Sequence, residues 1–216
     1  RWWAWGDGVD APTLPPHALA LLGEAVGTAS RPRPPAALED VAIPASALPE
    51  AAGAALAAAV GAEHVRTDHA IRVARAAGRS YPDLVRLRSG APGHAPDAVV
   101  LPGTHEEAAA VLAACTEHRI AVVPFGGGTS VVGGVEPLRG PFAAAVTVDL
   151  RRLDRLIAVD ERSLTATLQA GVLGPAAEEL LGARGLTLGH FPQSFEYASI
   201  GGFAATRSAG QASTGY

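Results

Sequence analysis

A run of glycine and hydroxyl residues occupies the middle of the chain, at positions 124–135 (PFGGGTSVVGGV). It follows directly on the apolar segment 120–123, whose residue types are those of a β-strand. Glycine costs conformational entropy, so a cluster of glycines is retained where the backbone needs a positive φ or a close approach. Consecutive N–H groups in such a loop can converge on an anionic group. The run therefore predicts a loop that binds a phosphate-bearing ligand.

Two well-known phosphate loops do not fit this run. A P-loop needs a lysine after its last glycine to reach the β- and γ-phosphates, and the chain contains no lysine. A Rossmann fingerprint opens a helix, whereas the residues after Gly128 are β-branched and glycine-rich and lack a helical apolar period. A glycine-rich turn without a ligand stays open as an alternative at this point.

A second stretch of similar character lies at residues 191–210 (FPQSFEYASIGGFAATRSAG). It combines a glycine pair with hydroxyl side chains, small residues and one arginine, Arg207. Two separate segments of this kind suit a ligand with two ends. Arg207 has two interpretations of equal weight: it complements phosphate charge, or it pairs with a carboxylate such as Glu196 and braces the loop.

The elements around these stretches alternate between strands and helices. Residues 98–101 and 120–123 are predicted strands on either side of a helix that starts at Thr104, with Glu107 in capping-box spacing, and runs to His118. The glycine run then falls at the carboxyl end of a strand, where α/β sheets bind ligands. Further strands are predicted at 143–150, 156–159 and 164–169, and a helix at 175–183.

The amino-terminal region, residues 1–92, is predicted to be all-helical and interrupted by prolines. The proline-rich segment 31–35 cannot be helical and predicts an extended linker. Thr67 and Asp68 have the residue types of a helix cap, and Gly78 has that of a helix end. We expect this region to pack on a larger domain formed by residues 93–216. Its predicted helices are 15–26, 48–60 and 70–77.

Five segments in order along the chain resemble the flavin-binding domain of the vanillyl-alcohol-oxidase and p-cresol-methylhydroxylase type. This is the PCMH-type, or type-4, FAD-binding domain, and the branch that the chain resembles most is the alkyldihydroxyacetonephosphate synthase group. The segments are RWWAWGD (1–7), GRSYPDL (78–84), PDAVVLP (96–102), the first glycine run (124–131) and the second stretch (200–210).

The resemblance implies an α+β fold. It consists of a two-lobed FAD-binding domain, with an α/β subdomain and a mainly antiparallel sheet, preceded by the helical amino-terminal region. In the family a long carboxyl-terminal part supplies the substrate cap and the acid-base residues. We expect that part to be absent here and the flavin domain itself to be incomplete at its carboxyl end, since the chain stops at residue 216.

The resemblance also implies which residues bind FAD. The first loop holds the pyrophosphate, and the second stretch runs along the flavin, with its glycine pair and following hydroxyls near the ring or the diphosphate. Some family members attach FAD covalently through a histidine in or near the first loop, and others use attachment points in parts of the family's chain that are absent here. This loop has no histidine or cysteine, so noncovalent FAD is expected. The candidate residues are Pro124, Gly126, Gly127, Gly128, Thr129, Ser130, Val131, Pro192, Gln193, Ser194, Glu196, Ser199, Gly201, Gly202, Thr206, Arg207 and Ser208.

Composition argues against several other functions. The net charge is −4 and no basic face is evident, so nucleic-acid binding has no electrostatic footprint. No apolar run approaches the roughly 20 residues of a membrane helix, and no secretory leader is visible, so we expect a cytoplasmic protein and leave a homodimer open.

The single Cys115 lies in an alanine-rich helical run that predicts a small buried residue. No metal site is expected, because His64 and His69 lack a third ligand in suitable spacing.

The sequence leaves the reaction open among three hypotheses, and we assign no catalytic residue. His190, beside the second stretch, is a conceivable general base, but a loop histidine without an identified partner is more often structural. The first hypothesis, which the tryptophan-rich start favours, is exchange of the acyl group of an acyl-dihydroxyacetone phosphate for a fatty alcohol, with a lipid-like substrate and no net redox change. The second is an FAD-dependent dehydrogenase or oxidase of a 2-hydroxy acid such as D-lactate. The third is a non-catalytic fragment of such an enzyme.

Overall fold

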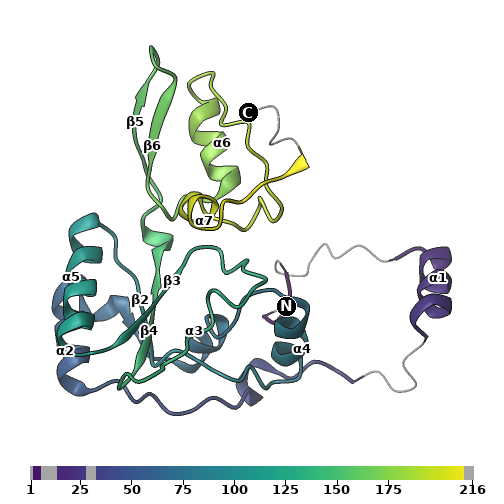
Figure 1. Cartoon of the computed structure of the whole chain (residues 1–216), viewed down its shortest axis with the longest axis horizontal. Coiled ribbons are helices and arrows are strands. Elements are labelled where there is room, and N and C mark those ends of the chain that lie inside the picture. Colours follow the sequence, from purple (N-terminus) through teal and green to yellow (C-terminus); the bar gives the residue numbers. More distant parts are fainter. Residues whose placement is uncertain (1, 6–13, 28–32, 212–216) are drawn as a thin grey trace.

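The computed structural model describes residues 2–5, 14–27 and 33–211, and residues 33–211 form two lobes (Figure 1). One lobe is built on a four-stranded sheet, and the other holds a β-hairpin and two helices. Strand β4 (Ala145–Asp149) and the short 3-10 helix η3 (Leu150–Arg152) lead from the first lobe into the second. Two further 3-10 helices, η1 (Leu38–Asp40) and η2 (Ala62–His64), lie in the amino-terminal region.

The sheet of the first lobe has the strand order β1-β2-β4-β3, with β1 at Val65–Arg66, β2 at Ala98–Val100 and β3 at Ala121–Phe125. Strands β2, β4 and β3 run parallel, and β1 is antiparallel to β2. Every residue of β2 and β4 is buried, as expected for parallel strands that are covered on both faces. Phe125 is opposite Asp149 in the register, so both strands end at the same edge of the sheet.

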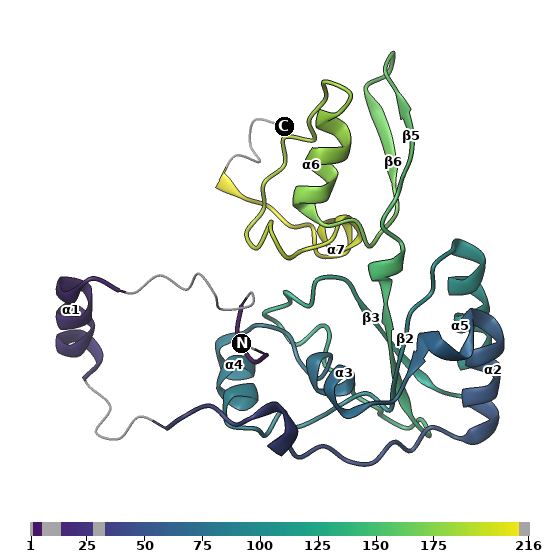
Figure 2. The same ribbon diagram turned by 180° about the vertical axis from the view of Figure 1, so that it is seen from behind.

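Helices cover both sides of this sheet (Figure 2). Helices α2 (Glu50–Val60) and α5 (His105–Glu117) lie on one side, and α3 (His69–Ala74) and α4 (Tyr81–Arg88) lie on the other. The main hydrophobic core lies between helices α2 and α5 and the face of the sheet that they cover, and its largest buried side chains include Leu56, Val100, Val111 and Val146. The amino-terminal region thus shares one core with the domain that follows it.

The predicted helices of the amino-terminal region are present, but the region is not all-helical as we expected. Helix α1 (Pro16–Val26) buries none of its residues. Asp68 caps α3 by accepting a hydrogen bond from the Ile71 N–H. The short strand β1 was not predicted, because two residues are too few to show a period. Of the predicted proline-rich linker, residues 31 and 32 lie outside the described part, and residues 33–35 have no regular structure.

The predicted cap of α5 is present in a modified form. The Thr104 hydroxyl accepts from the Glu107 N–H at 3.1 Å, as in a capping box. The Glu107 carboxylate, however, accepts from the N–H of Gly103, one residue before the cap. A complete capping box occurs instead at α4, where Ser80 and Asp83 each accept from the other's backbone N–H. The sequence analysis did not predict α4.

The second lobe contains the antiparallel hairpin of β5 (Leu156–Asp160) and β6 (Thr165–Leu168), which represents the antiparallel sheet expected after the α/β part. Helix α6 (Gly174–Gly182) confirms the helix predicted at 175–183. A further helix, α7 (Ile200–Thr206), follows near the end of the described residues. None of the helices in the described ranges has the length and hydropathy that crossing a lipid bilayer requires.

Cys115 lies on the buried face of α5 and is 2% exposed, which confirms the predicted small buried residue. Burial raises the pKa of its thiol to about 11, so the reactive thiolate is scarce at neutral pH. We expect iodoacetamide at pH 8 to leave Cys115 unmodified in the folded protein and to modify it after unfolding in urea. Mass spectrometry of the peptide that contains Cys115 measures this, and equal labelling of the folded and unfolded protein would contradict the buried position.

Candidate functional site

The glycine loop, residues 126–134, starts where β3 ends, at the sheet edge that also carries Asp149. Within the described part of the chain, the backbone N–H groups from Gly127 to Val131 have no hydrogen-bond acceptor. The Ser130 hydroxyl shapes the far side of the loop by accepting from the N–H of Gly134 at 3.0 Å. A row of consecutive N–H groups without protein partners is the arrangement that binds anions in backbone nests.

The structure brings the glycine loop into contact with the second stretch. A Cβ added at Gly126 would overlap the Ser199 hydroxyl, and one at Gly127 would overlap the backbone carbonyl of Tyr197. Gly128 has a φ of +68° and lies against the Phe125 ring, so it too leaves no room for a side chain. Gly126 and Gly127 are therefore required by the contact between the two segments, and Gly128 by its positive φ and its contact with Phe125.

The second stretch, predicted to be a loop, contains helix α7, and that part of the prediction is wrong. Ser199 caps the helix by accepting from the Gly202 N–H at 3.2 Å. The N–H groups of Ile200 and Gly201 donate to the carbonyls of Val172 and Ala170, at 2.8 and 2.9 Å. The first amides of α7 are thus bonded within the protein, in contrast to those of the glycine loop.

Two residues of the second stretch adopt a left-handed backbone that is rare for side chains other than glycine: Ser194 (φ 62°) and Arg207 (φ 51°). The Ser194 carbonyl accepts from the N–H groups of both Tyr197 and Ala198. Arg207 ends α7, and its exposed side chain forms no ion pair with Glu196, which is also exposed, within residues 33–211. The bracing role considered for Arg207 therefore has no support, and the phosphate role stays a prediction.

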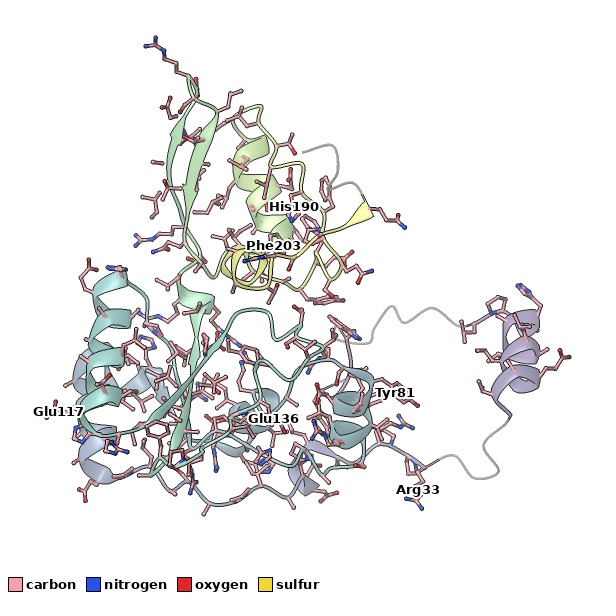
Figure 3. The ribbon with its side chains drawn as sticks, viewed as in Figure 1. Arg33, Tyr81, Glu117, Glu136, His190 and Phe203 are labelled. Carbon is pink, nitrogen blue, oxygen red and sulfur yellow. The ribbon has the colours of Figure 1, made fainter. Side chains whose placement is uncertain are left out.

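The hydroxyls at the carboxyl end of α7 bond to one another and to the helix. The Thr206 hydroxyl donates to the Gly202 carbonyl at 2.9 Å and lies 2.8 Å from the Ser208 hydroxyl. The His190 ring is 2.9 Å from the Ser208 carbonyl and packs edge-on against Phe203 (Figure 3). These contacts give His190 the structural surroundings that the sequence analysis favoured.

A hollow of about 660 Å³ lies beside the second stretch. Its volume is within the ~300–1,000 Å³ range of small-molecule sites. Pro192 and Gln193 are the candidate residues that line it, and no residue of the glycine loop does. The other lining residues are Phe191, Ala209, Gly210 and Gln211.

A buried charge cluster, which the sequence analysis missed, supports the glycine loop. Asp149 is fully buried and accepts from the Nε of Arg75 at 2.7 Å and of Arg151 at 3.0 Å. The Arg75 guanidinium also stacks over the Phe125 ring, 4.7 Å from its centroid. Burial raises the pKa of the Asp149 carboxyl, and Arg75 opposes that effect. The cluster fixes the ends of β3 and β4, from which the loop departs.

The tryptophan-rich start of the chain contacts both the second stretch and helix α4. Residues 1, 6 and 7 of that segment lie outside the described part. The Trp5 ring centroid is 5.5 Å from that of Tyr197, whose carbonyl contacts Gly127. Trp3 stacks with Arg88 of α4, and the Trp2 indole donates to the Ala36 carbonyl. The amino-terminal segment and the second stretch are therefore packed together.

Residues 96–216 match the family model described as an FAD binding domain. The chain belongs to this family of FAD-binding domains. FAD is therefore its cofactor, as the sequence analysis predicted. The fit is physical as well, because the free N–H groups of the glycine loop suit a diphosphate. The described residues contain no group of three potential metal ligands, so nothing here points to a metal centre.

The FAD-binding domain and its amino-terminal extension are together similar to alkyldihydroxyacetonephosphate synthases. The chain is 40% identical to the enzyme of Trypanosoma brucei brucei over 157 residues and 37% identical to that of Dictyostelium discoideum over 154 residues, which is 71% of this chain in each case. A solved structure of an alkyldihydroxyacetonephosphate synthase superposes on 90% of the chain with a TM-score of 0.82 and 31% identity. The chain spans 25% of the length of those two curated relatives and 37% of that solved chain.

Proposed function

We propose that the protein containing this chain is an alkyldihydroxyacetonephosphate synthase-like flavoenzyme of ether-lipid biosynthesis. It replaces the acyl group of an acyl-dihydroxyacetone phosphate with the alkoxy group of a fatty alcohol. The fatty acid is released, and the reaction has no net redox change. The similarity to the two curated synthases, which includes residues before the FAD-binding domain, supports this assignment.

The chain's part in this function is to hold FAD without a covalent bond. The row of free N–H groups from Gly127 to Val131 is the observation that carries this proposal. These groups bind the FAD diphosphate, and the second stretch, which contacts the loop at Gly126 and Gly127, lies along the rest of the cofactor. Pro192 and Gln193 then face the cofactor or the substrate from the hollow beside the second stretch.

The reaction is tested with the protein that contains this chain, purified with FAD. We expect it to convert palmitoyl-dihydroxyacetone phosphate and hexadecanol into the hexadecyl ether and free palmitate, detected by mass spectrometry, while a redox dye stays oxidised. Protein stripped of FAD is the control and should form no ether. Reduction of the dye with D-lactate and no ether product would instead favour the 2-hydroxy acid dehydrogenase. Absence of both activities in FAD-loaded protein would favour a non-catalytic flavin-binding protein.

A cytoplasmic location and a homodimeric state complete the proposal. The location is tested by fractionation of cells that produce the protein. Light scattering coupled to size-exclusion chromatography measures the oligomeric state, and the mass of a monomer would contradict the dimer.

A further inference from the structure

Arg79 lies against the glycine loop. Its backbone N–H donates to the Ser130 carbonyl at 2.7 Å. The preceding residue, Gly78, packs so closely on the same carbonyl that a Cβ at Gly78 would overlap it. The backbone at residues 78 and 79 is therefore fixed to the loop. The Arg79 side chain leaves this backbone beside Ser130, one of the residues whose N–H group has no acceptor.

The Arg79 guanidinium is a half-buried cation without a carboxylate partner among residues 33–211. Its hydrogen bond is to the carbonyl of its own neighbour, Gly78, at 3.0 Å. Burial lowers its pKa, and the nearby Arg75 lowers it further. The carboxylate that acts on it electrostatically, Asp83, is already bonded to Arg86 and to the Ser80 N–H. A cation in this position costs free energy until an anion neutralises it.

Near the glycine loop three arginines accompany the Asp149 carboxylate, and Glu136, beside Gly133, is already bonded to Arg86 and His94. Arg75 and Arg151 both bond to Asp149, so this carboxylate already has two guanidinium partners. Arg79 adds a third guanidinium, close enough to Arg75 for the two charges to repel, on a backbone that is bonded to the loop at Ser130. Free N–H groups and a desolvated guanidinium are the two kinds of donor that phosphate-binding sites combine.

We propose that the Arg79 guanidinium binds a phosphate group held against the glycine loop. This inference rests on the proposed function, which supplies two phosphates: the diphosphate of FAD and the phosphate of the dihydroxyacetone phosphate ester. Either one satisfies the same chemistry, a charge-assisted and bidentate contact to phosphate oxygens.

The first test measures binding of FAD to the apo form of the protein that contains this chain, by flavin fluorescence. Arg79→Gln is compared with Arg79→Lys and with the control Arg162→Gln, which neutralises an exposed arginine in the turn of the hairpin. If the diphosphate is the ligand, loss of this charged contact weakens FAD binding about 10- to 100-fold in Arg79→Gln. Arg79→Lys should recover part of the affinity, because it keeps the charge and loses the planar fork. The control should bind FAD like the wild type.

The second test identifies the other phosphate source. FAD-loaded wild type and Arg79→Gln are titrated with dihydroxyacetone phosphate, and the perturbation of the flavin absorption is followed. If the substrate phosphate is the ligand, Arg79→Gln binds FAD normally and binds dihydroxyacetone phosphate at least about tenfold more weakly. Unchanged affinity for both FAD and dihydroxyacetone phosphate would overturn the proposal.

A merely structural role for Arg79 gives a different result in the apo protein. Because the guanidinium is uncompensated there, Arg79→Gln should leave the melting temperature of the apo form unchanged or raise it. A lower melting temperature together with normal binding of both ligands would assign Arg79 to bracing the loop. If the wild type binds FAD but forms no ether lipid, the proposed reaction fails, while the binding comparison still decides the role of Arg79. A wild type that binds neither ligand overturns both.

Discussion

Gly127→Ala will strongly weaken FAD binding. A single added Cβ overlaps the backbone carbonyl of Tyr197, which cannot rotate away as a side chain would. The second stretch must therefore move away from the glycine loop, and the N–H groups that follow lose their alignment. Overpacking of this kind costs about 1–3 kcal/mol, which corresponds to roughly 10- to 100-fold in affinity if the strain is relieved at the binding site. Flavin absorbance per protein after gel filtration, and fluorescence titration of the apo form, measure the loss.

Gly182→Ala is the matched control, since it makes the same substitution elsewhere in the domain. Gly182 ends α6, is exposed, and an added Cβ there meets nothing within 4 Å. Alanine favours a helix over glycine by up to about 1 kcal/mol, so this variant should retain FAD and be no less stable than the wild type. Normal FAD retention in Gly127→Ala, beside a normal control, would remove the glycine loop from the site.

Asp149→Asn will strongly destabilise the fold. The substitution keeps the shape of the side chain but removes the negative charge that Arg75 and Arg151 share in a fully buried position. Removing one partner of a buried ion pair typically costs about 3–5 kcal/mol. We expect a loss in this range for the free energy of unfolding, measured by urea denaturation of the apo protein with circular dichroism.

The control for this prediction is Asp160→Asn. Asp160 lies at the exposed turn of the hairpin, where it accepts from Ser163 and Arg162. An exposed carboxylate with local hydrogen bonds contributes little to stability, so this variant should unfold near the wild-type midpoint. Equal midpoints for the two variants would show that the charge of Asp149 is not essential to the fold.

The sequence was sufficient to predict the elements with strong local signals. Thr104 and Glu107 predicted the start of α5, and the apolar segment before Pro124 predicted β3 and the position of the glycine loop at its end. Helix α4 was missed because its start, Ser80 to Asp83, includes a proline and has Asp rather than Glu at the third position. Helix α7 was missed because its glycine pair has low helix propensity. The carbonyls of Ala170 and Val172 hold its first turn, and they come from a distant part of the chain.

The site was predictable only where one local segment defines it. The glycine loop has a recognisable composition, so its residues could be selected from the sequence. The contact of Gly127 with Tyr197, and the pairing of Arg75 with Asp149, join residues that are far apart in the chain and have no local pattern. In the sequence, Arg79 is notable only as part of the segment GRSYPDL (78–84), because its lack of a carboxylate partner becomes visible only when its neighbours in space are known.

We claim that the protein binds FAD noncovalently, and the visible absorption spectrum of the purified protein that contains this chain tests this directly. The spectrum is recorded before and after precipitation with heat or acid. We predict a flavin spectrum in the native protein and recovery of the flavin, identified as FAD by mass spectrometry, in the supernatant. A folded protein that is colourless and takes up no added FAD would contradict the claim, and flavin that stays in the precipitate would contradict the noncovalent attachment.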